Sequence, residues 1–205
     1  MFKIIKKEPL NPSMTRMVIE APFVARKAMP GQFIILRVNE TGERIPLTIA
    51  DYDREAGTVT IIYQKVGKST LLLDEQEAGG YLMDFIGPLG KASELEGYKK
   101  AAVIGGGAGC AIAYPQAKAL HAMGTKVDMI AGFRDKDLII LENEMREASD
   151  RLIVMTDDGS NGNKGFVTAA LQKKYRRGRR LRPGDRHWAD SHDEGGFQPD
   201  QAVRH

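Results

Sequence analysis

One glycine-rich segment constrains the fold of this chain more than any other feature of the sequence. An apolar run at residues 101–104 leads directly into a cluster of glycines, and an alanine-rich segment follows at residues 111–120. This order is typical of a strand, a tight turn and a helix. Glycines let a phosphate approach the backbone closely, and the start of a helix offers it free N–H groups. The segment therefore predicts a phosphate-binding turn built from Gly105, Gly106, Gly107 and Gly109. Because Cys110 stands where the usual fingerprint has its third glycine, a turn without a ligand is the alternative.

The first 97 residues have the pattern of an antiparallel β-sheet. Runs of β-branched or aromatic residues at 17–20, 32–38 and 58–63 are separated by turn signals such as Pro30-Gly31. Short strands at this spacing predict a small antiparallel barrel. A short helix is expected near residues 69–75, with Ser69 or Thr70 near its N-terminal cap.

From about residue 98 the pattern changes to strands that alternate with helices. Strands are expected at residues 101–104, 126–131 and 152–155, and helices at 112–123 and 137–148. Such alternation is typical of βαβ units and a parallel sheet. The predicted fold is therefore an antiparallel β-barrel over residues 1–97, followed by an incomplete, Rossmann-like α/β domain over residues 98–174.

Composition narrows the class of protein. With 42% hydrophobic and 28% charged residues, the chain is expected to be globular, and no apolar run is long enough to cross a bilayer. The net charge of +3 is too small to indicate a nucleic-acid partner. A cytoplasmic location is expected, because the N-terminal residues lack the apolar core of a signal peptide.

Two motifs in the β-rich region carry groups that suit a phosphorylated cofactor. Arg44 can clamp a phosphate with its bidentate fork, and the Thr48 hydroxyl can hydrogen-bond a ring nitrogen. Farther along, Gly67, Ser69 and Thr70 can offer backbone and hydroxyl donors to a second phosphate. The plainer alternatives are an edge strand with an exposed arginine and an ordinary capped helix.

Two loops are expected close to a bound nucleotide. The segment 156–160 follows a predicted parallel strand, and ligands of such sheets sit outside the carboxyl ends of the strands. The alternative is a solvated turn that caps a helix starting near Val167. The segment 87–90 is either a linker turn or a loop at the cleft between the two predicted domains.

Taken in order and spacing, five motifs resemble those of the ferredoxin–NADP reductase superfamily. They are Arg-x-Pro-Leu-Thr at 44–48, Val-Gly-Lys-Ser-Thr at 66–70, Gly-Pro-Leu-Gly at 87–90, Gly-Gly-Gly-x-Gly at 105–109 and Thr-Asp-Asp-Gly-Ser at 156–160. More narrowly, the chain is similar to the electron-transfer subunits of the sulfide dehydrogenase, dihydroorotate dehydrogenase and NADH-dependent ferredoxin:NADP oxidoreductase group. The resemblance covers residues 1 to about 174.

The resemblance implies FAD on the barrel, NAD(P)H on the α/β domain and a larger catalytic partner subunit. It places FAD against Arg44, Pro46, Leu47, Thr48, Tyr63, Gln64, Gly67, Ser69 and Thr70. It places NAD(P)H against Gly105, Gly106, Gly107, Gly109, Asp157, Asp158, Gly159 and Ser160. No side chain is expected to act as a catalytic acid or base, because the cofactors carry the chemistry. Cys110 is expected to be a packing residue.

The chain departs from this family at its C-terminal end. The similar subunits carry a cysteine cluster for a [2Fe–2S] centre, which usually needs four thiolates, and this sequence holds one cysteine. Residues 175–205 are instead rich in arginine and expected to be a disordered tail. A frameshift near Lys173 is a further hypothesis, since codons compatible with residues 178–190 can be read one base later as a turn and a strand. Two rival interpretations are a regulatory nucleotide-binding module and an unstable, truncated subunit.

Overall fold

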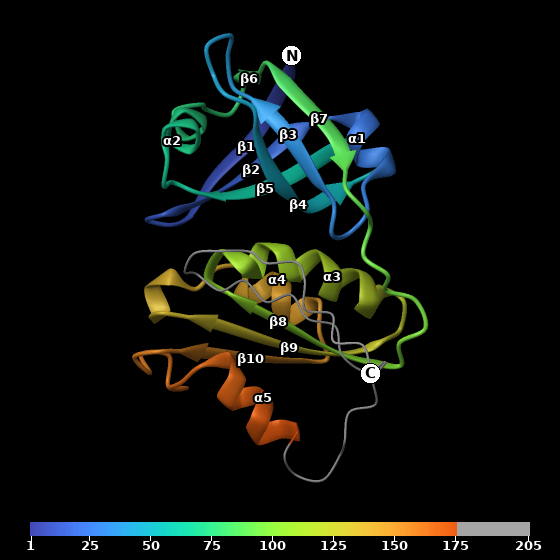
Figure 1. Ribbon diagram of the computed structural model, residues 1–205, viewed down its shortest axis with the longest axis vertical. Helices are drawn as coiled ribbons and strands as arrows, with labels where there is room; N and C mark the ends of the chain where they lie inside the picture. Colours follow the sequence, from blue (N-terminus) through green and yellow to red (C-terminus); the bar gives the residue numbers. More distant parts are fainter. Residues whose placement is uncertain (176–205) are drawn as a thin grey trace.

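Two separate sheets organise the chain, as the computed structural model shows (Figure 1). The structure describes residues 1–175, so the predictions of a disordered tail and a frameshifted segment fall mostly on residues outside the described part. One sheet is seven-stranded and antiparallel, and curves into a nearly closed barrel. The other is three-stranded and parallel, and lies below the barrel in Figure 1. The predicted fold class is therefore confirmed.

The barrel has the strand order β6-β1-β2-β5-β4-β3-β7. Its strands are β1 (Phe2–Asn11), β2 (Met14–Glu20), β3 (Phe33–Arg37), β4 (Ile45–Asp53), β5 (Thr58–Gln64), β6 (Tyr81–Leu82) and β7 (Asp84–Leu89). Two short helices, α1 (Pro22–Lys27) and α2 (Lys68–Asp74), join these strands. The 87–90 segment is thus mostly the end of β7 and not a free loop. Helix α2 lies where a helix was expected. Its N-cap is Gly67, and Ser69 and Thr70 lie in the first turn, near the cap, as predicted.

Side chains alternate between the inside and the outside of the barrel, as strand geometry requires. On β5, Val59, Ile61 and Tyr63 are buried in the barrel core together with Met17 and Ile19 of the neighbouring β2. The interior of the barrel is therefore filled by the inward-facing positions of its own strands.

The parallel sheet has the order β10-β9-β8, with β8 (Lys100–Gly106), β9 (Lys126–Phe133) and β10 (Arg151–Thr156). A 3-10 turn, η1 (Gly107–Gly109), leads from β8 into α3 (Cys110–Ala122). Figure 1 shows α3 and α4 (Glu142–Glu147) on the face of the sheet that looks toward the barrel, and α5 (Val167–Tyr175) on the opposite face. The three strands and α3 lie where the sequence predicted them.

The helix expected over residues 137–148 is broken in two. A 3-10 turn, η2 (Lys136–Leu138), comes first, and the helix α4 begins only after Ile140 and Leu141. Both side chains are buried in the core beneath α3. Leu141 takes a left-handed backbone conformation, with φ of 55°, at the N-cap of α4. Burial of two adjacent apolar side chains has overridden the helical pattern.

The barrel and the α/β unit share an apolar boundary. Met14, Ala50 and Ile62 of the barrel belong to the same buried cluster as Ala111 and Tyr114 of α3. Ala50 reaches this boundary because β4 has a register shift between Ile49 and Asp51, a bulge that kinks the strand. In the described part of the chain, no helix is long and apolar enough to cross a membrane.

Candidate functional site

Strand β4 turns two of its predicted site residues outward and one inward. Leu47 packs against the barrel core beside the fully buried Ile49. Pro46 and Thr48 alternate with them and face out of the barrel, on the side where Ala50 meets α3. Because β4 pairs with both β3 and β5, the alternative of an edge strand is wrong.

The predicted phosphate clamp, Arg44, is already held by a carboxylate. Its Nη2 atom lies 2.9 Å from Oδ2 of Asp84 on β7, and the same oxygen lies 2.8 Å from Nε of Arg37. Arg44 remains 55% exposed, whereas Arg37 and Asp84 are largely covered. This trio carries a net charge of +1 with its free donors on Arg44, an arrangement that favours an incoming anion.

The segment 64–70 brings the start of α2 beside the Arg44 loop. The Ser69 hydroxyl donates to Glu43, one residue before Arg44, at 3.2 Å. Thr70 instead shapes its own turn, since its hydroxyl oxygen accepts from the Gly67 N–H at 3.1 Å. A Cβ added at Gly67 would meet no atom within 4 Å, so this turn is open on its outer side. Gln64 is exposed at the end of β5.

Tyr63 points away from this surface. Its side chain is 2% exposed in the barrel core, and its hydroxyl donates to Oδ1 of Asp74 at 3.1 Å. Thr15 donates to the same oxygen at 2.7 Å. Burial acts to raise the pKa of Asp74, but these two hydrogen bonds and nearby lysines outweigh it and lower that pKa. Tyr63 therefore fastens α2 to the barrel, and its ring is not presented to an outside ligand.

The glycine turn is shaped by close contact between a strand end and a helix start. A Cβ on Gly105 would lie 2.9 Å from Cα of Cys110, so only glycine fits there. Gly107 has a left-handed φ of 49°, is exposed, and has open space around its missing side chain. Gly109 is buried as α3 begins. The turn thus exposes backbone directly ahead of the 13-residue helix α3, as a phosphate site requires.

Cys110 is a packing residue, as expected. It is fully buried at the start of α3, against Gly105 of β8, and burial raises the pKa of its thiol to about 12. A thiol with that pKa stays protonated at neutral pH and is a poor nucleophile. Together with the contact to Gly105, this explains why a small, apolar side chain occupies the position.

The loop 157–160 lies at the same edge of the sheet as the glycine turn but not beside it. Strand β9 separates β10 from β8, so the two loops are about 10 Å apart across the sheet. The Asp157 N–H donates to the Phe133 carbonyl, and the Ser160 hydroxyl accepts from the Lys136 N–H at 2.8 Å. A hydrogen bond from the Ser160 N–H lowers the pKa of the exposed Asp158 carboxyl. Gly159 closes the turn with a φ of 81°. The loop is thus joined to the end of β9.

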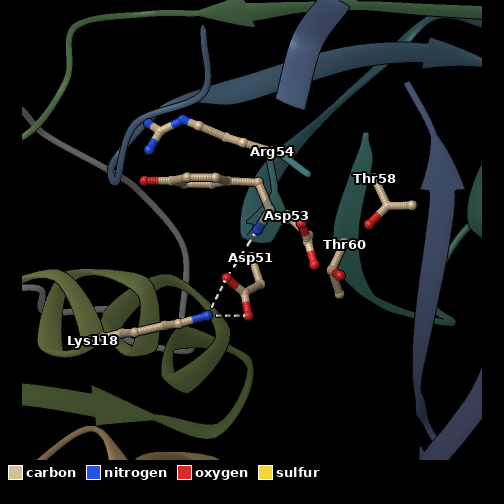
Figure 2. A pocket seen from close by; sticks show the side chains of 7 residues that line it. Asp51, Asp53, Arg54, Thr58, Thr60 and Lys118 are labelled. Carbon is tan, nitrogen blue, oxygen red and sulfur yellow. Dashed lines mark hydrogen bonds and ion pairs between the residues drawn. The ribbon is translucent and has the colours of Figure 1, made fainter. Parts of the chain in front are cut away.

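Two charged partners were not predicted from the sequence, namely Asp51 at the boundary with α3 and Asp84 within the barrel. Asp51, at the end of the β4 bulge, binds Lys118 of α3, and Figure 2 shows the two side chains pointing toward one another. Asp84 holds Arg44, as described above. One signal in the sequence could have indicated the contact of α3 with Asp51. Tyr114 and Lys118 are four residues apart on a helix, so their side chains share one face.

A metal centre does not fit the described residues. No group of three or more histidine, cysteine, aspartate or glutamate side chains gathers there in a way that holds a metal ion. The full sequence holds one cysteine, and it is buried at the start of α3. Four thiolates for an iron–sulfur cluster therefore cannot come from this sequence.

Known proteins resemble the chain over most of its length. No protein-family model matches it. It is 43% identical over 174 residues to a homolog of the dihydroorotate dehydrogenase B (NAD(+)) electron transfer subunit from Thermotoga maritima, a match that covers 85% of this chain and 61% of that protein. It is 32% identical over 185 residues to the electron transfer subunit of dihydroorotate dehydrogenase B (NAD(+)) from Bacillus caldolyticus, covering 83% and 71%.

The fold has a counterpart among solved structures. The structure of an NADH-dependent reduced ferredoxin–NADP oxidoreductase superposes with a TM-score of 0.81 and 41% sequence identity, covering 86% of this chain and 64% of that one. The chain therefore spans about three fifths of the length of the Thermotoga relative and somewhat more of this structure.

Proposed function

Because the chain belongs to the family of dihydroorotate dehydrogenase B electron transfer subunits, we propose that it is an oxidoreductase subunit that binds FAD and NAD(P)H. The observation that carries the proposal is that the surfaces suited to the two cofactors lie on two units in contact with each other. The outward face of β4 and the exposed turn ahead of α3 belong to two units that pack together at one apolar boundary. A flavin on the first and a nicotinamide on the second would meet there.

The barrel surface fits a flavin nucleotide in charge and shape. Arg44 offers free guanidinium donors beside the open turn at Gly67, and Ser69 lies within reach of the same loop. Pro46 and Thr48 give the outward face of β4 an apolar surface and a hydroxyl next to it. We assign the flavin phosphates to the Arg44 and Gly67 region, and the flavin ring to the surface at Pro46 and Thr48.

The α/β unit fits a dinucleotide at its glycine turn. The exposed, left-handed Gly107 leaves space that a side chain would fill, and α3 directs its N-terminal N–H groups toward that space. The loop 157–160 would bound the same site from two strands away. The proposed division is a flavin unit at 1–97 and a dinucleotide unit at 98–174.

When bound, the two cofactors would supply the redox chemistry, a hydride transfer between the nicotinamide and the flavin. The chain's own residues bind and orient them. Arg44 holds negative charge, the glycine turn holds a pyrophosphate, and the packing of Ala50 against α3 excludes water from part of the boundary. None of the described side chains there is placed as a proton donor or acceptor in this proposal.

Electrons would leave through a partner. We propose a larger catalytic subunit as that partner, because the relatives are named as electron transfer subunits. The single cysteine of this sequence cannot by itself hold an iron–sulfur cluster, so the proposal assigns the described residues no part in one. A cytoplasmic location remains part of the proposal, and cell fractionation tests it.

The visible absorption spectrum of the purified protein, before and after anaerobic NADH, tests the proposal. Flavin bands that bleach on addition of NADH are the expected result. Arg44→Ala should lower flavin occupancy without unfolding the barrel, since Arg44 is exposed. A folded protein that stays colourless after incubation with FAD would overturn the proposal and favour a regulatory module.

A further inference from the structure

One carboxylate joins the barrel to the α/β unit at the point where the proposed cofactor sites approach. The Nζ atom of Lys118 lies 2.7 Å from each carboxylate oxygen of Asp51. The Tyr114 hydroxyl donates to Oδ2 of Asp51 at 3.4 Å, and the Tyr52 N–H donates to Oδ1 at 2.9 Å. Asp51 is thus held by its own strand on one side and by two side chains of α3 on the other.

The two elements that this contact joins are the ones that carry the proposed sites. On β4, Asp51 follows Thr48 by three residues and adjoins Ala50, which packs at the boundary. On α3, Lys118 lies two turns into the helix whose start is the glycine turn. A shift of β4 against α3 would therefore move one proposed site relative to the other.

Other polar contacts across the boundary involve different elements. Arg16 of β2 binds Glu144 of α4 at 2.5 Å, and the Asn11 side chain donates to the Leu138 carbonyl at 3.1 Å. These contacts hold the barrel to α4 and to η2, and not to α3. Among the described ion pairs, Asp51–Lys118 is the one that connects β4 with α3.

The contact lies where water and salt reach it. Asp51 and Lys118 keep 30% and 49% of their side-chain surface exposed, and both line a cavity of about 340 Å³ (Figure 2). The cavity is also lined by Asp53, Arg54 and Thr60. An ion pair in such a setting is weak and screened by salt, so it can bias an orientation without locking it.

We propose that Asp51 and Lys118 form a positioning latch that biases α3 toward one placement against β4 and thereby favours one separation of the two cofactor sites. The inference rests on the proposed function, since that function places the sites on these two elements. Rates of transfer depend steeply on such separations, and a displacement of about 1 Å costs as much as 100-fold in rate. In this proposal Asp51 and Lys118 act through β4 and α3, as positioning residues.

The first test needs no cofactor. Spin labels on Glu55→Cys in the barrel and Met123→Cys after α3, two exposed positions, report the distance between the units. The expected result is a narrow distance distribution for the parent chain and a broader one for Asp51→Asn. Arg146→Gln, which removes an ion pair within α4, is the matched control and should leave the distribution unchanged.

The second test is the rate of flavin reduction by NADH in the flavin-loaded protein. Asp51→Asn should lower the rate constant by about two- to fivefold, with flavin content unchanged. Raising the ionic strength from about 0.05 M to about 0.5 M should slow the parent chain and not the variant. The exchanged pair Asp51→Lys with Lys118→Asp should recover most of the loss.

The two tests separate the latch from the function on which it rests. If the protein takes up no flavin, the proposed function fails, while the label distances still decide whether Asp51 holds the units together. If the distances and the rate in Asp51→Asn both equal those of Arg146→Gln, the ion pair is an incidental surface contact and the inference is overturned.

Discussion

The barrel and the α/β unit differ in how each completes its core. Seven strands close around the barrel core, whose buried residues all come from the barrel. The α/β unit has three described strands, and its core on the α3 face includes Met14, Ala50 and Ile62 from the barrel. Small sheets bury too little apolar surface to be stable alone. The barrel is therefore expected to fold by itself, and the α/β unit to depend on it.

A cavity in each core would test this dependence most strongly. Ile61 in the barrel and Met129 in β9 are both fully buried, and replacing either by alanine should cost about 2–5 kcal/mol. Ile61→Ala should destabilise both units, whereas Met129→Ala should leave the barrel intact. Urea unfolding followed by amide hydrogen exchange distinguishes these patterns. A Met129→Ala protein in which both units unfold together would contradict the proposed independence of the barrel.

Gly105→Ala should affect the α/β unit alone. The added Cβ would lie 2.9 Å from the Cys110 backbone, so the strand end and helix start must separate. We expect a loss of about 1–3 kcal/mol in the stability of this unit and weaker NADH binding, because overpacking displaces backbone. Gly67→Ala in the barrel is the control, since nothing lies within 4 Å of that Cβ. An equal loss of stability in Gly105→Ala and Gly67→Ala would show that the close contact at Gly105 does not limit which residue fits there.

Tyr63→Phe should weaken the attachment of α2 to the barrel. It removes one hydrogen bond to Asp74 and should cost about 1 kcal/mol of stability at neutral pH. The pKa of Asp74 is lowered below its ordinary value near 3.8 in the folded protein, so its stabilising effect is full above that pH and is lost as the pH falls toward the folded pKa. The difference between Tyr63→Phe and the parent chain should therefore shrink in acid. A difference that is constant from neutral pH to below 3.8 would contradict this coupling.

The smallest expected effect is on the reactivity of Cys110. Because burial raises the pKa of its thiol to about 12, alkylation at neutral pH should proceed only when the α/β unit opens. The rate of Cys110 alkylation should rise in Met129→Ala. It should also rise in Ile61→Ala, to the extent that the loss of barrel stability destabilises the α/β unit. Rapid alkylation of the folded parent chain would show that this unit opens more readily than its packing suggests.

The sequence was sufficient where local pattern controls structure. Runs of β-branched and aromatic residues predicted β2, β3 and β5 of the barrel, and the run from 101 to 120 predicted β8, the glycine turn and α3. The break before α4 was missed, because burial of Ile140 and Leu141 depends on the distant α3. The assignment of cofactors to individual residues, and the boundary at residues 97–98, remain predictions.

Within the candidate site, the limits of sequence reasoning are visible at single residues. Tyrosine is a residue type that suits a cofactor surface. The alternation of β5 nevertheless places the Tyr63 side chain in the barrel core, where it contacts Asp74. Arg44 was expected to clamp a phosphate, and the structure adds Asp84 as its partner, 40 residues along the chain. Neither partner can be read from neighbouring positions.

The sequence by itself therefore determined the order of elements and the position of the glycine turn, since both follow from the periodicity and chemistry of adjacent residues. Only the tertiary structure decided which face of β4 looks outward, how the bulge brings Ala50 to the boundary, and that Asp51 meets Lys118. These outcomes depend on contacts between residues far apart in the chain, whose pairing is fixed by the packing of one unit against the other.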